Sequence, residues 1–176
     1  MPYVLLGCQI MVGTVFLASV AGKVRGRRAY SAFLAAIGGL APGLPPSRRQ
    51  ALAPLMIAGE SAVAALLAVP VTARAGFVAA VVLLAVFTVA ITAAIRARRR
   101  VSCACFWDSS VAVGPAQLIR NGVLLACSLT GAVLGPGAWS AAPEPGGVAA
   151  AALAGLAGAG LVILTDDIAA LFRPLG

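Results

Sequence analysis

Twenty consecutive uncharged residues, GFVAAVVLLAVFTVAITAAI, occupy positions 76–95. A helix of this length can cross the hydrocarbon core of a bilayer, which requires about 20 mostly apolar residues. Four further apolar stretches lie at about 4–21, 52–71, 118–134 and 147–164. The sequence therefore predicts an all-α fold, a polytopic membrane helix bundle of four core helices plus a fifth span. We expect one integral membrane domain over residues 1–176.

The composition agrees with this class of protein and excludes several functions. Hydrophobic residues make up 61% of the 176 positions and charged residues 10%, whereas soluble domains carry about 25% charged residues. Histidine is absent, which excludes Ser-His-Asp catalysis, histidine-ligated haem and metal sites that need imidazole. The net charge of +8 indicates contact with anionic membrane lipid and a fixed orientation, and no nucleic-acid binding is expected.

The positive charges predict the orientation. Twelve of the 13 basic residues flank the first and third connections or lie in the C-terminal tail, and only Arg74 falls on the other side. Cytoplasmic loops carry such an excess, so we expect the N-terminus outside and the C-terminus in the cytoplasm. The first apolar run follows Met1, Pro2 and Tyr3 without a positive charge, so it is not expected to be a secretory signal peptide.

Prolines mark the first and last long connections as loops. Before the first of these loops, residues 27–37 are predicted to form a short helix at the membrane interface. The prediction rests on Tyr30, Phe33, Leu34 and Ile37, which recur at three- and four-residue spacing.

The segment VSCACFWD at 101–108 contains the best candidates for chemistry, Cys103 and Cys105. The arginines at 98–100 favour the thiolate, which is the form that attacks a disulfide. A disulfide within Cys-x-Cys closes a small, distorted ring, which is typical of exchange sites. Two alternatives remain open: a pair of unreactive thiols at a helix end, and a zinc site that also recruits Cys8 and Cys127.

Cys8 and Cys127, each taken alone, are interpreted as small apolar core residues. On the predicted topology Cys8 and Cys103 face opposite membrane surfaces. A direct disulfide between these two is therefore not expected, because the Cα atoms must lie within about 7 Å.

Glu60 is the one acidic residue deep inside a predicted span. A carboxylate in hydrocarbon is costly, so Glu60 should face the bundle and be either paired or protonated. Lys23 and Arg120 lie at the cytoplasmic ends of the first and fourth spans, from where either could reach it. A polar clamp between helices and a functional proton or quinone site both remain open.

The fifth span carries small residues, Ala151, Gly155 and Ala159, at four-residue spacing. Such a face lets helix backbones approach closely, either within the bundle or between protomers of a homo-oligomer. Asp166 and Asp167 follow at its inner end. We expect them to pair with the basic loops and assign them no chemistry.

An ordered set of residues along the chain resembles the methylamine-utilisation MauE family, part of a broader DoxX-like group of small membrane proteins. The residues that carry the resemblance are Phe16, Ala18, Gly22, Lys23, Phe33, Leu40, Pro42, Ala53, Glu60, Cys103, Ala104, Cys105, Phe106, Arg120 and Asn121. Trp107 departs from the pattern, because the family's Cys-x-Cys-Phe motif is usually followed by glycine.

This resemblance implies a redox-associated protein of the bacterial cytoplasmic membrane. The family is linked to maturation of disulfide-containing periplasmic proteins, methylamine dehydrogenase among them, and its relatives occur beside thioredoxin-like partners. The resemblance implies thiol–disulfide or electron transfer by Cys103 and Cys105. The chain would then be a membrane oxidoreductase or the accessory subunit of one. Glu60, Arg120, Asn121 and Lys23 would then form a polar intramembrane site.

Two points stay open at the level of sequence. The positive charges place the Cys-x-Cys segment on the cytoplasmic side, whereas the family's client folds outside. The alternative function is a non-catalytic membrane scaffold or a lipid-binding assembly subunit. A transporter has weaker support, because the chain shows no internal repeat.

Overall fold

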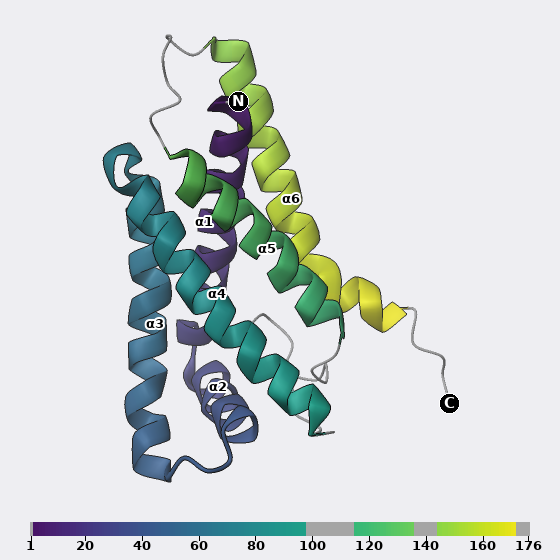
Figure 1. Ribbon diagram of the computed structural model, residues 1–176. Coiled ribbons are helices and arrows are strands. Elements are labelled where there is room, and N and C mark those ends of the chain that lie inside the picture. Colours follow the sequence, from purple (N-terminus) through teal and green to yellow (C-terminus); the bar gives the residue numbers. More distant parts are fainter. Residues whose placement is uncertain (1, 98–114, 136–143, 172–176) are drawn as a thin grey trace.

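The computed structural model describes residues 2–97, 115–135 and 144–171, with backbone alone for residue 115 and for 165–171 (Figure 1). Within these ranges the chain forms helices and no strand, which confirms the predicted all-α class. The α-helices are α1 (Pro2–Val24), α2 (Arg27–Leu40), α3 (Pro46–Ala68), α4 (Ala73–Arg96), α5 (Pro115–Leu134) and α6 (Pro145–Leu171), with a 3₁₀ turn η1 (Pro70–Thr72) before α4. Cys103, Cys105 and Trp107, and the side chains of Asp166 and Asp167, lie outside the described residues.

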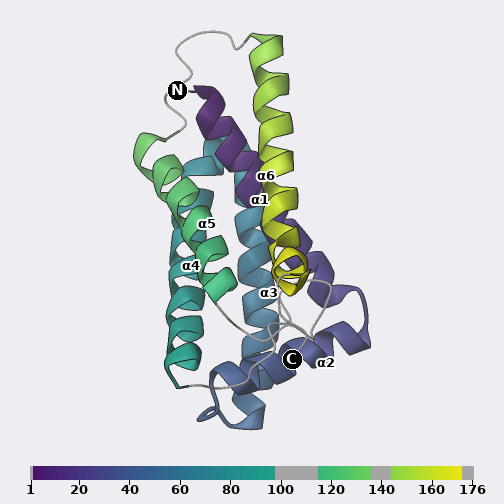
Figure 2. The same ribbon diagram turned by 90° about the vertical axis from the view of Figure 1, so that its right-hand side faces the viewer.

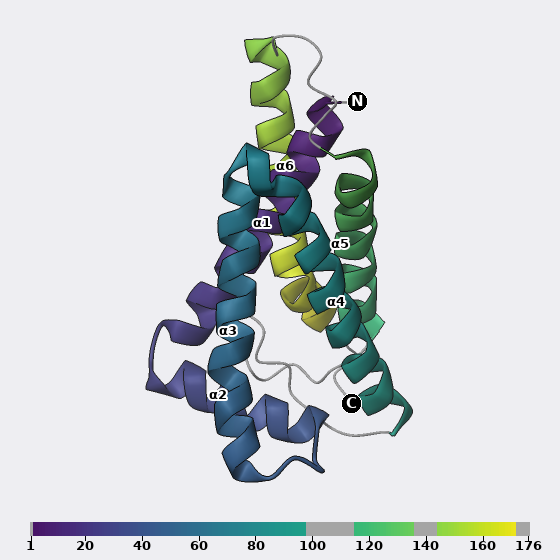
Figure 3. The same ribbon diagram turned by 60° about the vertical axis from the view of Figure 1, so that its left-hand side comes forward.

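Five of the described helices, α1, α3, α4, α5 and α6, are long and apolar enough to cross a membrane. They correspond to the five predicted spans and alternate in direction (Figures 1 and 3). The N-terminus therefore lies at the same end of the bundle as the α3–α4 connection, and α2 lies at the other end, where α4 terminates. We call these the N-terminal end and the α2 end of the bundle.

The second span begins and ends earlier than expected. The apolar run predicts about 52–71, but α3 starts at Pro46, where the missing proline N–H would lack a helical partner in any case. α3 ends at Ala68 because Pro70 has no backbone N–H to donate a helical hydrogen bond. The 3₁₀ turn η1 follows. The Thr72 hydroxyl closes this turn by donating to the Leu66 carbonyl at 2.8 Å.

The short helix expected at 27–37 is confirmed and extends to Leu40 as α2. It lies across the α2 end of the bundle rather than along its axis (Figure 2). Phe33 and Ile37 are buried against Ala53 of α3, and Tyr30 and Leu34 pack around the same cluster. The apolar face predicted from the residue spacing therefore covers one end of α3.

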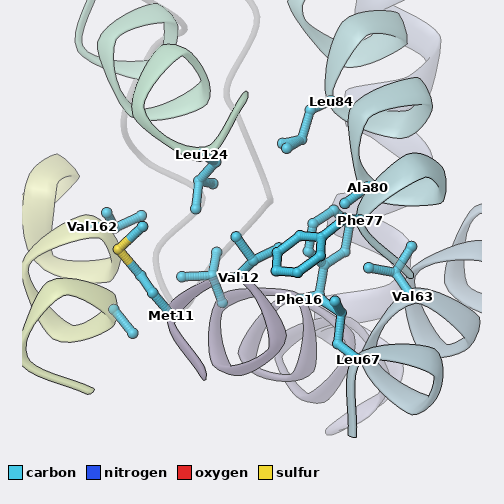
Figure 4. Packing of buried hydrophobic residues seen from close by; sticks show 12 residues of the cluster. Met11, Val12, Phe16, Val63, Leu67, Phe77, Ala80, Leu84, Leu124 and Val162 are labelled. Carbon is cyan, nitrogen blue, oxygen red and sulfur yellow. The ribbon is translucent and has the colours of Figure 1, made fainter. Parts of the chain in front are cut away.

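The main core lies around α1 (Figure 4). Val12 and Phe16 of α1 pack with Phe77 of α4 in the same cluster. Members from the other helices include Val63, Leu67, Leu84, Leu124 and Val162, which come from α3, α4, α5 and α6. Each long helix thus contributes apolar side chains to one core.

The outward faces of the long helices are apolar too. Leu55, Val89, Leu129, Leu153 and Leu161 are each about half exposed or more. A soluble protein rarely exposes a contiguous apolar surface of this kind, whereas hydrocarbon covers it in a membrane. The bundle is therefore a multi-pass membrane protein that contacts lipid around its circumference.

The small-residue face of α6 packs against α1 within the chain. Ala151, Gly155 and Ala159 are all buried, and α6 packs along α1 more extensively than along α5. A Cβ atom at Gly155 would lie 2.7 Å from the Gly7 carbonyl oxygen, so only glycine permits the observed approach. Of the two uses predicted for this face, the structure therefore shows packing within the bundle.

A buried polar cluster at the α2 end

Lys23 of α1 and Glu60 of α3 form a buried ion pair. The Lys23 Nζ atom lies 2.6 Å from Glu60 Oε1 and 2.5 Å from Oε2, and both side chains are 2% exposed. Lys23 is one of the two cations predicted to lie within reach of Glu60, and it forms an ion pair with this carboxylate. The pair links the last turn of α1 to the middle part of α3.

Two neighbours complete the surroundings of the ammonium group. Ser19 lies four residues before Lys23, so both side chains are on the same face of α1. Its hydroxyl accepts from Lys23 Nζ at 2.8 Å and donates to Glu60 Oε2 at 3.3 Å. The Phe33 ring of α2 lies with its centroid 4.9 Å from Lys23 Nζ, which is within range for a cation–π contact. Three helices thus converge on one ammonium group.

A polar face of α5 approaches the same region. Gln117, Arg120, Asn121 and Ser128 are each at least nine-tenths buried, and they follow a helical spacing with Leu124 between them. The Asn121 side-chain amide donates to the Thr88 hydroxyl of α4 at 3.4 Å. Because uncompensated polar groups in hydrocarbon are costly, this face turns inward rather than toward lipid.

A small cavity joins the ion pair to α5. Its volume is about 40 Å³, and Ser19, Glu60, Arg120 and Asn121 supply its polar lining. The apolar lining comes from Val15, Phe16, Leu84, Phe87 and Leu124. A water molecule needs roughly 10–15 Å³ by this measure, whereas sites for larger ligands occupy about 300 Å³ or more. The cavity has room for a few water molecules beside the carboxylate and none for a quinone ring.

The structure therefore brings together Lys23, Glu60, Arg120 and Asn121, the four residues predicted for a polar intramembrane site. The other two candidates, Cys103 and Cys105, lie outside the described residues. Among the residues described, no group of three or more cysteine, aspartate or glutamate side chains is arranged to hold a metal ion.

Three buried polar residues of this region, Ser19, Gln117 and Ser128, were not predicted as site residues from the sequence. The signal was present as helical spacing. Ser19 stands one turn before Lys23, and Gln117 and Ser128 share a face with Arg120. Polar residues at such spacing within an apolar span indicate an inward face, because the bilayer offers them no partner.

Comparison with known proteins identifies the family. The sequence profile described as methylamine utilisation protein MauE matches residues 1–134 of the 176, which run through the last residue of α5. The matched part contains the whole polar cluster, and α6 follows it. No curated protein sequence matches the chain, and no solved structure does. Since the profile covers most of the sequence and four of its five candidate spans, the chain belongs to the MauE family.

Proposed function

We propose that this MauE-family membrane protein supports thiol–disulfide or electron transfer for the maturation of an extracytoplasmic redox partner. Cys103 and Cys105 would be the exchanging pair, and a thioredoxin-like protein is the expected kind of partner. Family membership supports the proposal, as does the Cys-x-Cys motif beside three arginines. Whether the chain is the oxidoreductase or its accessory subunit depends on whether these thiols themselves exchange.

The position of the buried polar cluster is the structural observation that carries this proposal. The chain leaves α4 at Arg96 and enters α5 at Pro115, and both points lie at the α2 end. Arg120 stands five residues into α5, roughly 8 Å along its axis. The described end of α4 and the start of α5, which flank the sequence containing Cys103 and Cys105, therefore lie at the end of the bundle nearest Arg120.

The exchange is balanced in atoms and electrons. One cysteine, as the thiolate, attacks a sulfur of the partner disulfide, and a mixed disulfide forms as one partner thiolate leaves. The second cysteine then attacks the mixed disulfide, which closes the Cys103–Cys105 bond and leaves the partner with two thiols. The reverse sequence transfers a disulfide to the partner. Arg98, Arg99 and Arg100 favour the attacking thiolate.

The role assigned to Lys23, Glu60, Arg120 and Asn121 is positioning. The ion pair joins α1 to α3, and the Asn121 bond joins α5 to α4. These polar contacts keep the helices that flank the Cys-x-Cys segment in register at one end of the bundle. They would act on the exchange through helix position rather than by contact with the reacting sulfur atoms.

The decisive experiment replaces both candidate cysteines. A strain that lacks this protein is complemented with the native chain or with Cys103→Ser/Cys105→Ser, and extracytoplasmic proteins are analysed by differential alkylation and mass spectrometry. The double variant should leave client thiols unpaired, as the empty strain does, at a normal level of membrane-inserted protein. The controls, Ser102→Ala and Ser109→Ala, alter the same segment and should behave as the native chain. Full client maturation in the double variant would refute the proposal.

A non-catalytic role in lipid binding has one supporting observation. An open cleft of about 680 Å³ runs between α1 and α3. Its lining is mostly apolar and includes Leu6, Ile10, Leu17 and Ala64, and Gln9, Thr14 and Ser61 add polar groups. The cleft has the volume to hold part of an acyl chain. Under this alternative the cysteine double variant would retain client maturation. Bulky substitution of Gly13, which lies in the cleft lining, would then reduce lipid co-purification.

We place the α2 end in the cytoplasm and the N-terminal end outside, in the bacterial cytoplasmic membrane. Among the described basic residues, Arg74 alone stands at the N-terminal end, and the rest lie in the half nearer α2. Cytoplasmic loops carry such an excess. A membrane-impermeant amine or thiol reagent applied to intact cells should therefore label single probes placed near residue 74 and spare probes placed near residue 27. The opposite pattern would overturn the orientation.

A further inference from the structure

Two cysteines far apart in the sequence meet in the bundle. The side chains of Cys8 of α1 and Cys127 of α5 lie within interaction range of each other and line the same cleft. Both are free thiols and both are only half buried. Taken singly in the sequence each has the character of an ordinary core residue, and only the packing of α1 against α5 makes them a pair.

The pair lies toward the N-terminal end of the bundle. Cys8 is six residues from the start of α1 and Cys127 is seven residues from the end of α5. At 1.5 Å per residue these positions are roughly 9 and 11 Å from that end. The two thiols therefore share one depth, toward the N-terminal end of the bundle.

An open cleft exposes both sulfur-bearing side chains. It has a volume of about 540 Å³, and its lining extends along α1 from Tyr3 past Cys8 to Met11, with Cys127 and α6 opposite. At its outer end the Tyr3 hydroxyl accepts an exposed hydrogen bond from the Glu144 backbone N–H at 3.1 Å. The cleft thus connects the thiols to the outer end of the bundle, whereas a cysteine that only fills core volume would be enclosed.

The contact favours a disulfide on geometric grounds. A disulfide requires Cβ atoms about 4 Å apart, on backbones that already face each other. Thiols on neighbouring helices whose side chains already lie within interaction range need only a side-chain adjustment to reach this geometry. Closure would also join α1 to α5, two helices that pack against each other along the core.

We propose that Cys8 and Cys127 are a second redox pair, which closes to an inter-helix disulfide by exchange with a protein disulfide at the outer end of the bundle. On closure two S–H bonds are lost and one S–S bond forms. The two electrons and two protons pass to the partner, whose disulfide becomes two thiols. That this end is extracytoplasmic rests on the orientation given above, whereas the redox pairing itself does not.

The pairing is tested on the full chain in detergent or lipid nanodiscs. The background is Cys103→Ser/Cys105→Ser, so that Cys8 and Cys127 are the only thiols left. Oxidised glutathione serves as the disulfide probe, and intact mass with alkylation provides the readout. We expect a species that is two hydrogens lighter, with both thiols blocked together and both recovered by dithiothreitol.

A matched control moves one thiol by a single residue. In the same background, Cys127→Ala with Ala126→Cys turns the sulfur by about 100° around α5 onto an exposed position. This variant should accumulate glutathione adducts without internal closure. The single variant Cys8→Ser should likewise trap a mixed disulfide at Cys127. Circular dichroism and the membrane-inserted level show whether each variant is folded.

Two results would overturn the pairing. One is a native Cys8 and Cys127 pair that remains alkylatable under oxidised glutathione. The other is a pair in which each sulfur carries its own glutathione without closure. Because the assay uses a chain without Cys103 and Cys105, either result leaves the function proposed for those residues untouched. Conversely, closure in this assay stands even if the Cys103/Cys105 double variant supports full client maturation in cells.

Discussion

Replacing one partner of the Lys23–Glu60 pair should destabilise the bundle unequally, depending on which partner is removed. Lys23 stands one residue before the end of α1, and its long flexible side chain can extend toward the headgroups when Glu60 is neutralised. Glu60 stands eight residues from one end of α3 and 14 from the other, roughly 12 and 21 Å. Its short side chain cannot reach the headgroup region from there, so Lys23→Met should cost more than Glu60→Gln.

The magnitudes follow from the geometry of the pair. Removing one partner of a buried ion pair costs about 3–5 kcal/mol. We therefore expect Lys23→Met to lower the free energy of unfolding by about 3–4 kcal/mol. Glu60→Gln, which keeps an acceptor for the Ser19 hydroxyl, should lower it by about 1–2 kcal/mol.

The assay is equilibrium unfolding of the purified protein in mixed micelles of mild detergent and sodium dodecyl sulfate, followed by circular dichroism. The expected difference of about 2 kcal/mol between the two variants is roughly a 30-fold difference in unfolding equilibrium. The double variant Lys23→Met/Glu60→Leu should recover to within about 1.5 kcal/mol of the native chain, because no buried charge of the pair remains. The control, Ser61→Ala, changes the exposed neighbour of Glu60 and should cost about 0.5 kcal/mol or less.

Equal losses in the two single variants would refute this reasoning. So would a loss below about 1 kcal/mol in Lys23→Met, which is the size of an ordinary substitution. Arg120 lines the same cavity as Glu60. Such a result would mean that Arg120 can replace Lys23 as the counter-charge, and that the cluster tolerates exchange of its cations.

Three packing predictions need only stability measurements on purified variants. Gly155→Ala should lower the free energy of unfolding by about 1–3 kcal/mol, because the new Cβ atom meets the α1 backbone. In the control, Gly160→Ala on the same helix, the new Cβ atom meets nothing within 4 Å. This control should raise the free energy of unfolding by up to about 1 kcal/mol. Gly131→Ala should also destabilise the bundle by about 1–3 kcal/mol, because its Cβ atom would overlap an aromatic ring of α4. Its control, Gly122→Ala on the same helix, adds a Cβ atom in open space and should be neutral or stabilising. Ser128→Ala should be neutral or stabilising, because within the described part of the chain this fully buried hydroxyl has no hydrogen-bond partner. A loss of stability above about 1 kcal/mol would show that the hydroxyl is hydrogen-bonded in solution.

Much of the fold could be predicted because a bilayer limits the choices. A chain in hydrocarbon must satisfy its backbone internally, so each long apolar run becomes a helix. The run at 76–95 corresponds to α4, and the spacing of Phe33 and Ile37 predicted the covered face of α2. The helix ends were less predictable. Hydropathy locates the apolar region, whereas the limits of α3 depend on Pro46 and Pro70.

Four residues of the candidate site were predictable from the sequence, but their pairing was not. The energetic cost of a carboxylate in hydrocarbon is enough to assign Glu60 to an inward face from its place in an apolar span. Which cation would pair with it depends on the rotation of each helix about its axis, and this is set by packing around α1. The structure pairs Glu60 with Lys23 and places Arg120 at the adjoining cavity, with Ser19 and Phe33 completing the contacts of the ammonium.

Sequence by itself determined the class of this protein, the number of its candidate spans and the inward direction of its buried charges. Each of these follows from the cost of placing polar groups in hydrocarbon, which acts residue by residue along the chain. Tertiary structure alone decided which helix faces meet. It turned the small residues of α6 toward α1 and brought Cys8 together with Cys127. Such contacts join residues far apart in sequence, so they depend on how whole helices pack and not on any local pattern.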